Sequence, residues 1–82
     1  MATTYLDAKG LLCPLPVLRA RKALKRLDIG DVLVVETTDD ASPADMAAFC
    51  TATGERLLRS ERGEGGYRFE IERAAGVPRA ES

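Results

Sequence analysis

The chain alternates between two spacings of apolar residues, one typical of helices and one typical of strands. Apolar residues three and four apart, from Val17 to Leu27, predict one face of a helix, and a similar face recurs in the second half of the chain. Strict alternation from Tyr67 to Ile71 predicts a half-buried strand, whereas the continuous apolar run that starts at Val32 predicts a central strand. In chain order the predicted elements are strand 3–7, helix 14–27, strand 32–36, helix 43–53, strand 55–61 and strand 67–72.

Residues with special backbone preferences mark the ends of several elements. Ser42, followed by Pro43 and three residues on by Asp45, is typical of a capped helix start, so we interpret Asp45 as a capping residue rather than a catalytic acid. Gly54 suits the left-handed residue that ends this helix. The run Gly-Glu-Gly-Gly at 63–66 joins two strands and opens no helix, so it predicts a hairpin turn and not a phosphate-binding loop.

The order of the elements, β-α-β-α-β-β, predicts the fold class. A chain of 82 residues supports one modest core. Two helices of about a dozen residues cover only one face of a four-stranded sheet, so we predict an α/β two-layer sandwich: a mixed four-stranded sheet with two helices on one face. Residues 1–73 are expected to form a single domain, and residues 74–82 a flexible C-terminal tail.

Composition and charge narrow the classes of function. A net charge of -1 and a pI near 5.4 argue against direct binding to nucleic acid, which normally needs a basic excess. No apolar run reaches the roughly 18–20 residues that span a bilayer. The first residues, MATTYLD, lack the basic and apolar regions of a secretion signal, so we expect a cytoplasmic protein with reduced thiols. We also expect the protein to be monomeric on its own and to bind no cofactor.

Two cysteines and no histidine leave few chemistries for a site. There is no Cys-His nucleophile pair, and two cysteines far apart in the sequence do not complete a tetrahedral metal site, so no bound metal is expected. Cys50 falls on the apolar face of the second helix, where core packing is favoured over the alternative of a second redox cysteine. Cys13 is therefore the candidate for chemistry.

Cys13 stands at the predicted start of the first helix, within the segment GLLCPLPVLRARKAL. Unpaired N–H groups and the positive end of the helix dipole favour an anion there and lower the pKa of a thiol. With Cys13 as N-cap, Pro14 and Pro16 occupy the first turn, where a missing N–H is tolerated, and Leu15 provides the main free donor. These features predict an exposed, outward-pointing sulfur with a modestly lowered pKa. If they lie near the same edge, Asp7, Asp39 and Asp40 would raise that pKa, whereas Lys9 would lower it. A small buried cysteine is the alternative.

The segment LDAKGLLCPLPVLRARKAL resembles the signature of the TusA/SirA-type sulfur-carrier family, a Cys-Pro-x-Pro motif at the start of the first helix. Further similar segments are GDVLVVETTDD, DMAAFC and GYRFEIER, so the resemblance extends over residues 5–73. It implies the β-α-β-α-β-β sandwich that the element order also predicts.

The resemblance further implies that Cys13 accepts sulfane sulfur as a persulfide, with Pro14 and Pro16 as the supporting motif. The implied partners are a cysteine desulfurase or a rhodanese as donor and a downstream acceptor protein, in tRNA thiolation or in sulfur oxidation and trafficking. Such a chain is a sulfurtransferase-type carrier and not an autonomous enzyme; the competing interpretation is a regulatory or protein-binding module of the same fold. Well-studied members of the family carry an acidic residue where this chain has Leu15, and often an arginine where it has Leu12. This departure bears on which partner proteins the chain binds, more than on the carrier chemistry itself.

The first helix is strongly basic. Its region holds five of the 12 basic residues and no acid before Asp28, so the rest of the chain has a net charge of -6. A basic helix beside the thiol is expected to steer an acidic partner, whereas a solvated basic face is the alternative. The candidate docking residues are Leu15, Leu18, Arg19, Lys22 and Arg26.

Overall fold

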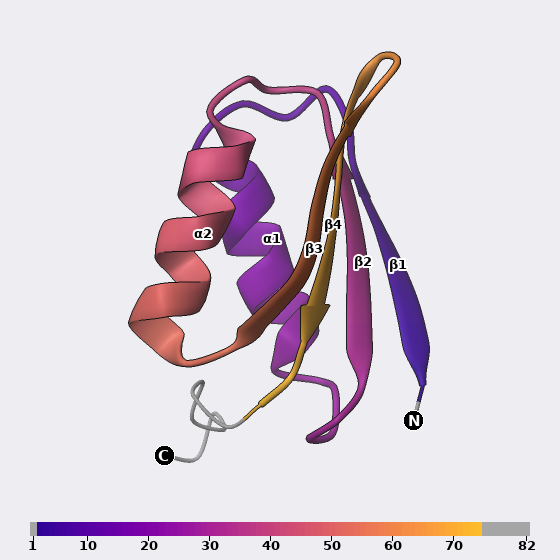
Figure 1. Cartoon of the computed structure of the whole chain (residues 1–82), viewed down its shortest axis with the longest axis vertical. Helices are drawn as coiled ribbons and strands as arrows, with labels where there is room; N and C mark the ends of the chain where they lie inside the picture. The colour runs from indigo at the N-terminus through magenta and orange to yellow at the C-terminus, as the bar shows by residue number, and fades with distance from the viewer. Residues whose placement is uncertain (1, 75–82) are drawn as a thin grey trace.

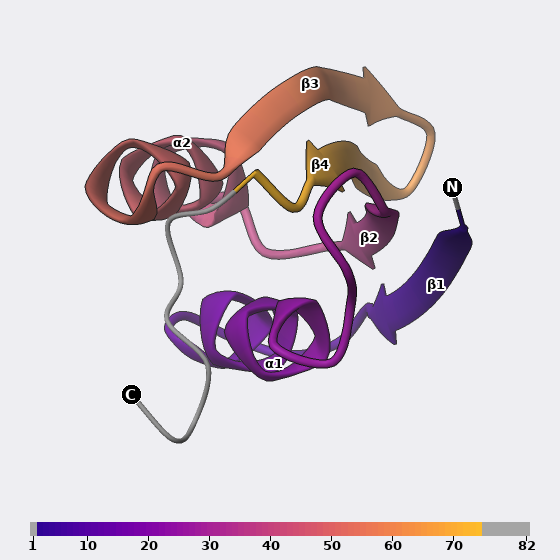
Figure 2. The same cartoon turned by 90° about the horizontal axis from the view of Figure 1, so that it is seen from below.

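The computed structural model of the chain describes residues 2–74, and its elements follow the predicted order (Figure 1). They are β1 (Thr3–Ala8), α1 (Leu15–Leu24), β2 (Val32–Thr37), α2 (Ser42–Thr53), β3 (Arg56–Gly63) and β4 (Gly66–Glu72). The strands form one sheet in the order β1-β2-β4-β3, with β1 parallel to β2 and the other neighbours antiparallel. Both helices lie against one face of this sheet (Figure 2). The predicted two-layer sandwich is confirmed. Of the tail predicted at 74–82, all residues after Ala74 lie outside the part of the chain that the structure describes.

The core fills the space between the helices and the two central strands. Alternate side chains of β2 and β4 point inward because successive residues of a strand face opposite sides of the sheet. Val35 is paired with Phe69 and Leu33 with Ile71, and all four side chains are fully buried. The helices complete this cluster with Ala20, Leu24, Met46, Phe49 and Cys50. The prediction that Cys50 packs in the core is confirmed.

The ends of α1 differ from the predicted ones. The helix ends at Leu24 rather than Leu27, because the N–H groups of Arg26 and Leu27 bond to carbonyls three residues back and tighten the chain into a turn. At its start, Pro14 is the N-cap and Leu15 the first helical residue. Cys13 therefore precedes the helix instead of capping it, and the predicted N-cap position of the thiol is wrong.

The start of α2 also differs from the prediction. Ser42 is the first helical residue and Ala41 is the N-cap, which offers no capping side chain. Asp39 organises this turn: its carbonyl accepts the Ser42 N–H at 3.0 Å and its Oδ1 accepts the Ala41 N–H at 3.4 Å. Asp45 lies in the first turn, as expected, and Gly54 ends the helix at φ 85°, as predicted.

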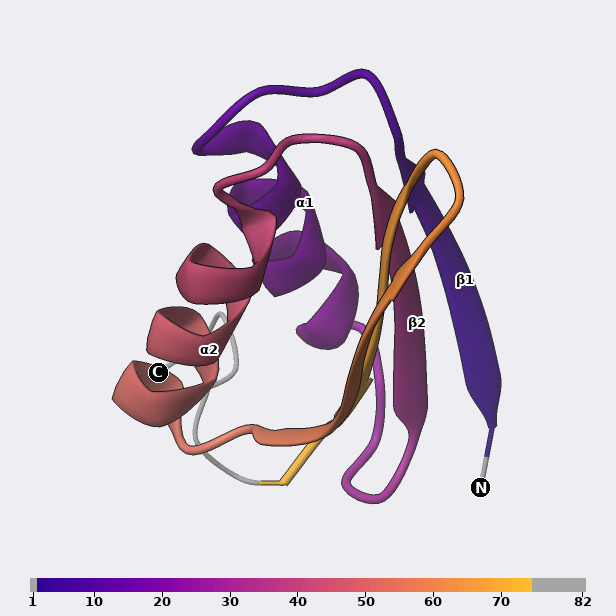
Figure 3. The same ribbon diagram turned by 45° about the horizontal axis from the view of Figure 1, so that its top comes forward.

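The loops that follow β1 and β2 run side by side at one edge of the sheet (Figure 3). Because β1 and β2 are parallel, both chains leave the sheet at the same end before turning into α1 and α2. The Gly10 N–H donates to Thr38 Oγ1 at 2.8 Å and joins the two loops. The start of α1 is thereby held beside the start of α2. In the part of the chain described, no helix has the length and apolar character needed to cross a membrane.

Candidate functional site

Cys13 is exposed in the turn that precedes α1, whereas Cys50 is buried. The Cys13 backbone N–H donates to Asp39 Oδ2 at 2.7 Å, and its peptide bond to Pro14 is cis. The backbone of the thiol-bearing residue is thus fixed to the loop before α2. The exposure of Cys13 agrees with the expected outward-pointing sulfur and disagrees with the alternative of a small buried cysteine.

The first turn of α1 offers the sulfur little stabilisation as an anion. Pro14 and Pro16 have no N–H to donate. The Leu15 N–H, expected to be the free donor, donates to the Leu12 carbonyl at 2.8 Å. Since Cys13 also lies before the N-cap, the anion-binding geometry of a helix start is not reproduced at its sulfur.

Acidic side chains from α2 and its preceding loop face the thiol. The nearby Asp45 carboxylate, which would accept a hydrogen bond from the thiol, is the main cause that raises the pKa of Cys13 above its ordinary value. Partial loss of contact with water and the charges of Asp45 and Asp39 act in the same direction. The expected lowering of the Cys13 pKa is therefore wrong, because the carboxylates outweigh the helix start.

The sequence interpretation missed the role of Asp45 at this site. The sequence predicts a cap at Asp45, yet its carboxylate is the main cause of the raised pKa of the Cys13 thiol. The parallel pairing of β1 and β2 contained a usable signal, because segments that follow neighbouring parallel strands meet at one sheet edge. Acidic residues after β2 are thus expected near a thiol placed after β1.

The predicted docking residues lie mostly on one outer face of α1. Leu15, Leu18, Arg19 and Lys22 are spaced by three and four residues and are exposed, Leu15 at 43% and Leu18 at 50%. We call these four residues the basic face. Arg26 is exposed but follows the helix in the turn beyond Leu24, so it is not part of this face. Within residues 2–74, none of the basic residues of the α1 region is in an ion pair.

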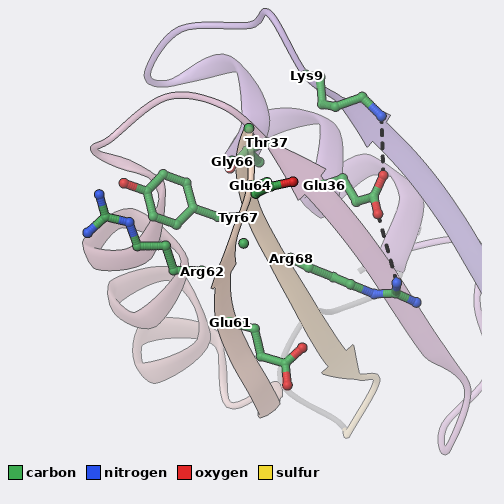
Figure 4. Close-up of a pocket in the computed structure, with 11 residues that line it drawn as sticks. Lys9, Glu36, Thr37, Glu61, Arg62, Glu64, Gly66, Tyr67 and Arg68 are labelled. Atoms are coloured by element: carbon green, nitrogen blue, oxygen red, sulfur yellow. Dashed lines mark hydrogen bonds and ion pairs between the residues drawn. The ribbon is translucent and has the colours of Figure 1, made fainter.

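An open pocket of about 310 Å³ lies at the β3–β4 hairpin (Figure 4). Three of its charged side chains pair with one another: Lys9 Nζ lies 3.2 Å from Glu36 Oε1, and the Arg68 guanidinium lies 3.9 Å from Glu36 Oε2. Cys13 is not among the lining residues. The run 63–66 forms the end of this hairpin, as predicted. Among the residues described, no three or more cysteine, aspartate or glutamate side chains are grouped so as to hold a metal ion.

Comparisons with known proteins agree with this fold and motif. The family model described as "Sulfurtransferase TusA" matches residues 4–73. The "Sulfur carrier protein TusA" of Allochromatium vinosum is 45% identical over 69 residues, which cover 84% of this chain and 91% of that protein. The crystal structure of a SirA-like protein from Desulfitobacterium hafniense is similar with a TM-score of 0.76 at 30% identity, covering 90% of this chain and 99% of that one. The chain therefore belongs to the TusA family.

Proposed function

We propose that this chain is a sulfur carrier in which Cys13 accepts sulfane sulfur as a persulfide and passes it to a partner protein. The observation that carries the proposal is that Cys13 is exposed, within the Cys-Pro-x-Pro motif of a TusA-family chain. The relative from Allochromatium vinosum is named as a sulfur carrier. The donor is a cysteine desulfurase or a rhodanese, and the acceptor is a second protein in tRNA thiolation or in sulfur oxidation and trafficking.

The chemistry of loading is attack of the Cys13 sulfur on the terminal sulfur of the donor persulfide. A new S–S bond forms at Cys13 while the S–S bond of the donor breaks, and the electron pair stays on the donor sulfur, which leaves as a thiolate. One disulfide-type bond replaces another, so no external oxidant or reductant is needed. The Cys13 proton passes to solvent or to a group of the donor, which suits a chain without histidine.

Incubation with a cysteine desulfurase and cysteine is expected to add about 32 Da, one sulfur atom, to the wild-type chain. The Cys13→Ser variant should gain nothing, because a hydroxyl oxygen in place of the thiol forms no persulfide. Intact-protein mass spectrometry measures the adduct, and peptide mapping assigns it to Cys13 or Cys50. An unmodified wild-type protein, or an adduct confined to Cys50, would instead favour a regulatory or protein-binding module.

We further propose that an acidic surface of the sulfur donor docks on the basic face of α1. Leu15 and Leu18 present apolar area next to Cys13, and Arg19 and Lys22 extend the same face with two positive charges. Opposite charges across an interface speed association and orient the partners. Docking there brings the donor to the end of α1 at which the thiol is exposed.

Reversing both charges, with Arg19→Glu and Lys22→Glu, is expected to slow loading of Cys13 by about tenfold or more at low salt. The physical reason is lost electrostatic steering, so the deficit should shrink as salt is added. The rate of adduct formation by mass spectrometry measures it. The matched control, Arg56→Glu with Arg59→Glu on β3, makes the same change in net charge at another surface. Equal loading rates of the two double variants at low salt would remove the basic face from the docking site.

A further inference from the structure

Asp39 connects the segment that carries Cys13 with the start of α2. Its Oδ2 accepts the Cys13 N–H at 2.7 Å, from a residue 26 positions earlier in the chain. Its Oδ1 accepts the Ala41 N–H at 3.4 Å, and its carbonyl accepts the Ser42 N–H at 3.0 Å. Asp39 therefore fixes both the turn that opens α2 and the backbone of the thiol-bearing residue.

The Cys13 N–H needs such a partner because it lies outside the helix. Pro14 is the N-cap of α1, so the Cys13 N–H comes before the intrahelical bonds. Pro14 itself has no N–H, and the Leu15 N–H donates to a carbonyl three residues back. Three residues before Cys13, the Gly10 N–H donates to Thr38 Oγ1 at 2.8 Å. The segment that carries the thiol is thus held at two points by the β2–α2 loop.

We propose that Asp39 is a positioning residue for sulfur transfer, which holds the Cys13 backbone so that the sulfur is presented to a docked donor in one orientation. The proposal rests on the carrier function proposed above. A cysteine side chain has a single rotatable bond, χ1, between its backbone and its sulfur. Once the backbone is fixed, the sulfur can occupy only the few staggered positions of χ1.

Orientation matters for this reaction because the donor persulfide is attached to a second protein. In the transfer step the Cys13 sulfur forms a bond to the terminal sulfur of the donor, while the donor S–S bond breaks and leaves its electron pair on the donor sulfur. The attacking sulfur must be aligned with the bond that breaks, inside the docked complex. A small reagent such as iodoacetamide approaches an exposed thiol from any open direction. Loss of the Asp39 bond should therefore impair transfer from a docked donor and not alkylation.

Two variants separate the hydrogen bond of Asp39 from its charge. The charge is one cause of the raised pKa of Cys13, so its removal favours the thiolate. Asp39→Ala and Asp39→Asn remove the same charge, but asparagine keeps a side-chain oxygen that can accept the Cys13 N–H. A difference between these variants therefore reports the hydrogen bond.

The first measurement is the mobility of the Cys13 backbone, by amide relaxation NMR without any donor. We expect a Cys13 order parameter of about 0.85 in the wild type and in Asp39→Asn, and below about 0.6 in Asp39→Ala. The second is single-turnover loading by a cysteine desulfurase that carries a persulfide. Asp39→Ala should lower the rate at saturating donor about tenfold or more and shift the donor concentration at half-maximal rate less than about twofold, since positioning acts after docking. Asp39→Asn should stay within about threefold of the wild type, and alkylation should not slow in either variant.

Asp40→Ala is the matched control, because it removes the same charge and a carboxylate hydrogen bond from the same loop. Asp40 accepts the Tyr67 hydroxyl at 2.7 Å, so its variant should keep the order parameter and the loading rate of the wild type. Slow alkylation of the buried Cys50 shows that each variant is folded. If Asp39→Ala folds poorly, Asp39→Ser replaces it, since a serine hydroxyl can serve the local turn but is one bond shorter than the reach to Cys13.

Equal order parameters or equal loading rates in the folded alanine and asparagine variants of Asp39 would overturn the proposal. The same losses in Asp40→Ala would overturn it as well. A wild-type chain that accepts no sulfur would contradict the carrier function instead, and the order parameters would still decide whether Asp39 positions Cys13.

Discussion

Replacing Phe69 with alanine is expected to lower the free energy of unfolding by about 3–5 kcal/mol. Phe69 is fully buried on the central strand β4, between its register partners Val35 on β2 and Ser60 on β3. Its ring also stacks beside that of Tyr67, with centroids 6.4 Å apart. Removing the ring leaves a cavity between the sheet and both helices. Since domains are stable by only roughly 5–15 kcal/mol, the variant should lie near its unfolding threshold.

Urea unfolding followed by circular dichroism measures this effect as a fall in the transition midpoint at unchanged slope. Leu58→Ala is the matched control, because Leu58 also lies in the sheet but is 47% exposed, at the irregularity between Leu57 and Arg59. Its loss should stay below about 1 kcal/mol. A comparable loss in both variants would contradict the placement of the core around Phe69.

The sheet and its core followed from the sequence because they depend on local periodicity. Alternation with a period of two sends Phe69 and Ile71 to the same side of β4 wherever that strand pairs. The apolar run of β2 has the character of a strand between two others, and it lies between β1 and β4. These patterns need no knowledge of distant neighbours.

The ends of the helices depend on single hydrogen bonds, which the sequence does not specify. Either Cys13 or Pro14 is compatible with a proline-rich helix start. The choice is made by the Leu18 N–H, which donates to the carbonyl of Pro14 at 3.1 Å as the first bond of the helix and so places the cap at Pro14. Likewise Ser42 has the composition of an N-cap, but the Asp39 carbonyl and carboxylate organise that turn.

The electrostatics of the thiol were mispredicted for a different reason. The expected low pKa considered the helix that follows Cys13 and weighted its dipole above the neighbouring acids. Asp45 is separated from Cys13 by all of α1 and β2 in the sequence, yet its carboxylate raises the pKa of the thiol because α2 packs beside α1. A rule about one helix cannot include a carboxylate supplied by another. Cys13 is exposed nonetheless, so its raised pKa does not come from deep burial.

At about pH 7, iodoacetamide is expected to modify Cys13 about 100-fold faster than Cys50. Cys13 is exposed, whereas burial raises the pKa of Cys50 to about 11 and requires the fold to open before reagent can reach it. Peptide mapping of partly labelled protein gives both rates in one sample. In guanidinium chloride the two thiols should react at similar rates, which shows that the fold and not the local sequence causes the difference. Similar rates in the native protein would contradict the burial of Cys50.

The same experiment, repeated over a range of pH, separates exposure from activation. A thiol activated by a helix start would react faster at neutral pH than a cysteine in an unfolded peptide, whose pKa is about 8.5. Because Asp45 raises the pKa of Cys13, we expect native Cys13 to react more slowly than denatured Cys13 at about pH 7 and to gain rate as the pH rises past that of the free thiol. Faster native labelling would restore the helix-start interpretation. Slower labelling would mean that the thiol is accessible but ionises less readily at neutral pH than a free cysteine.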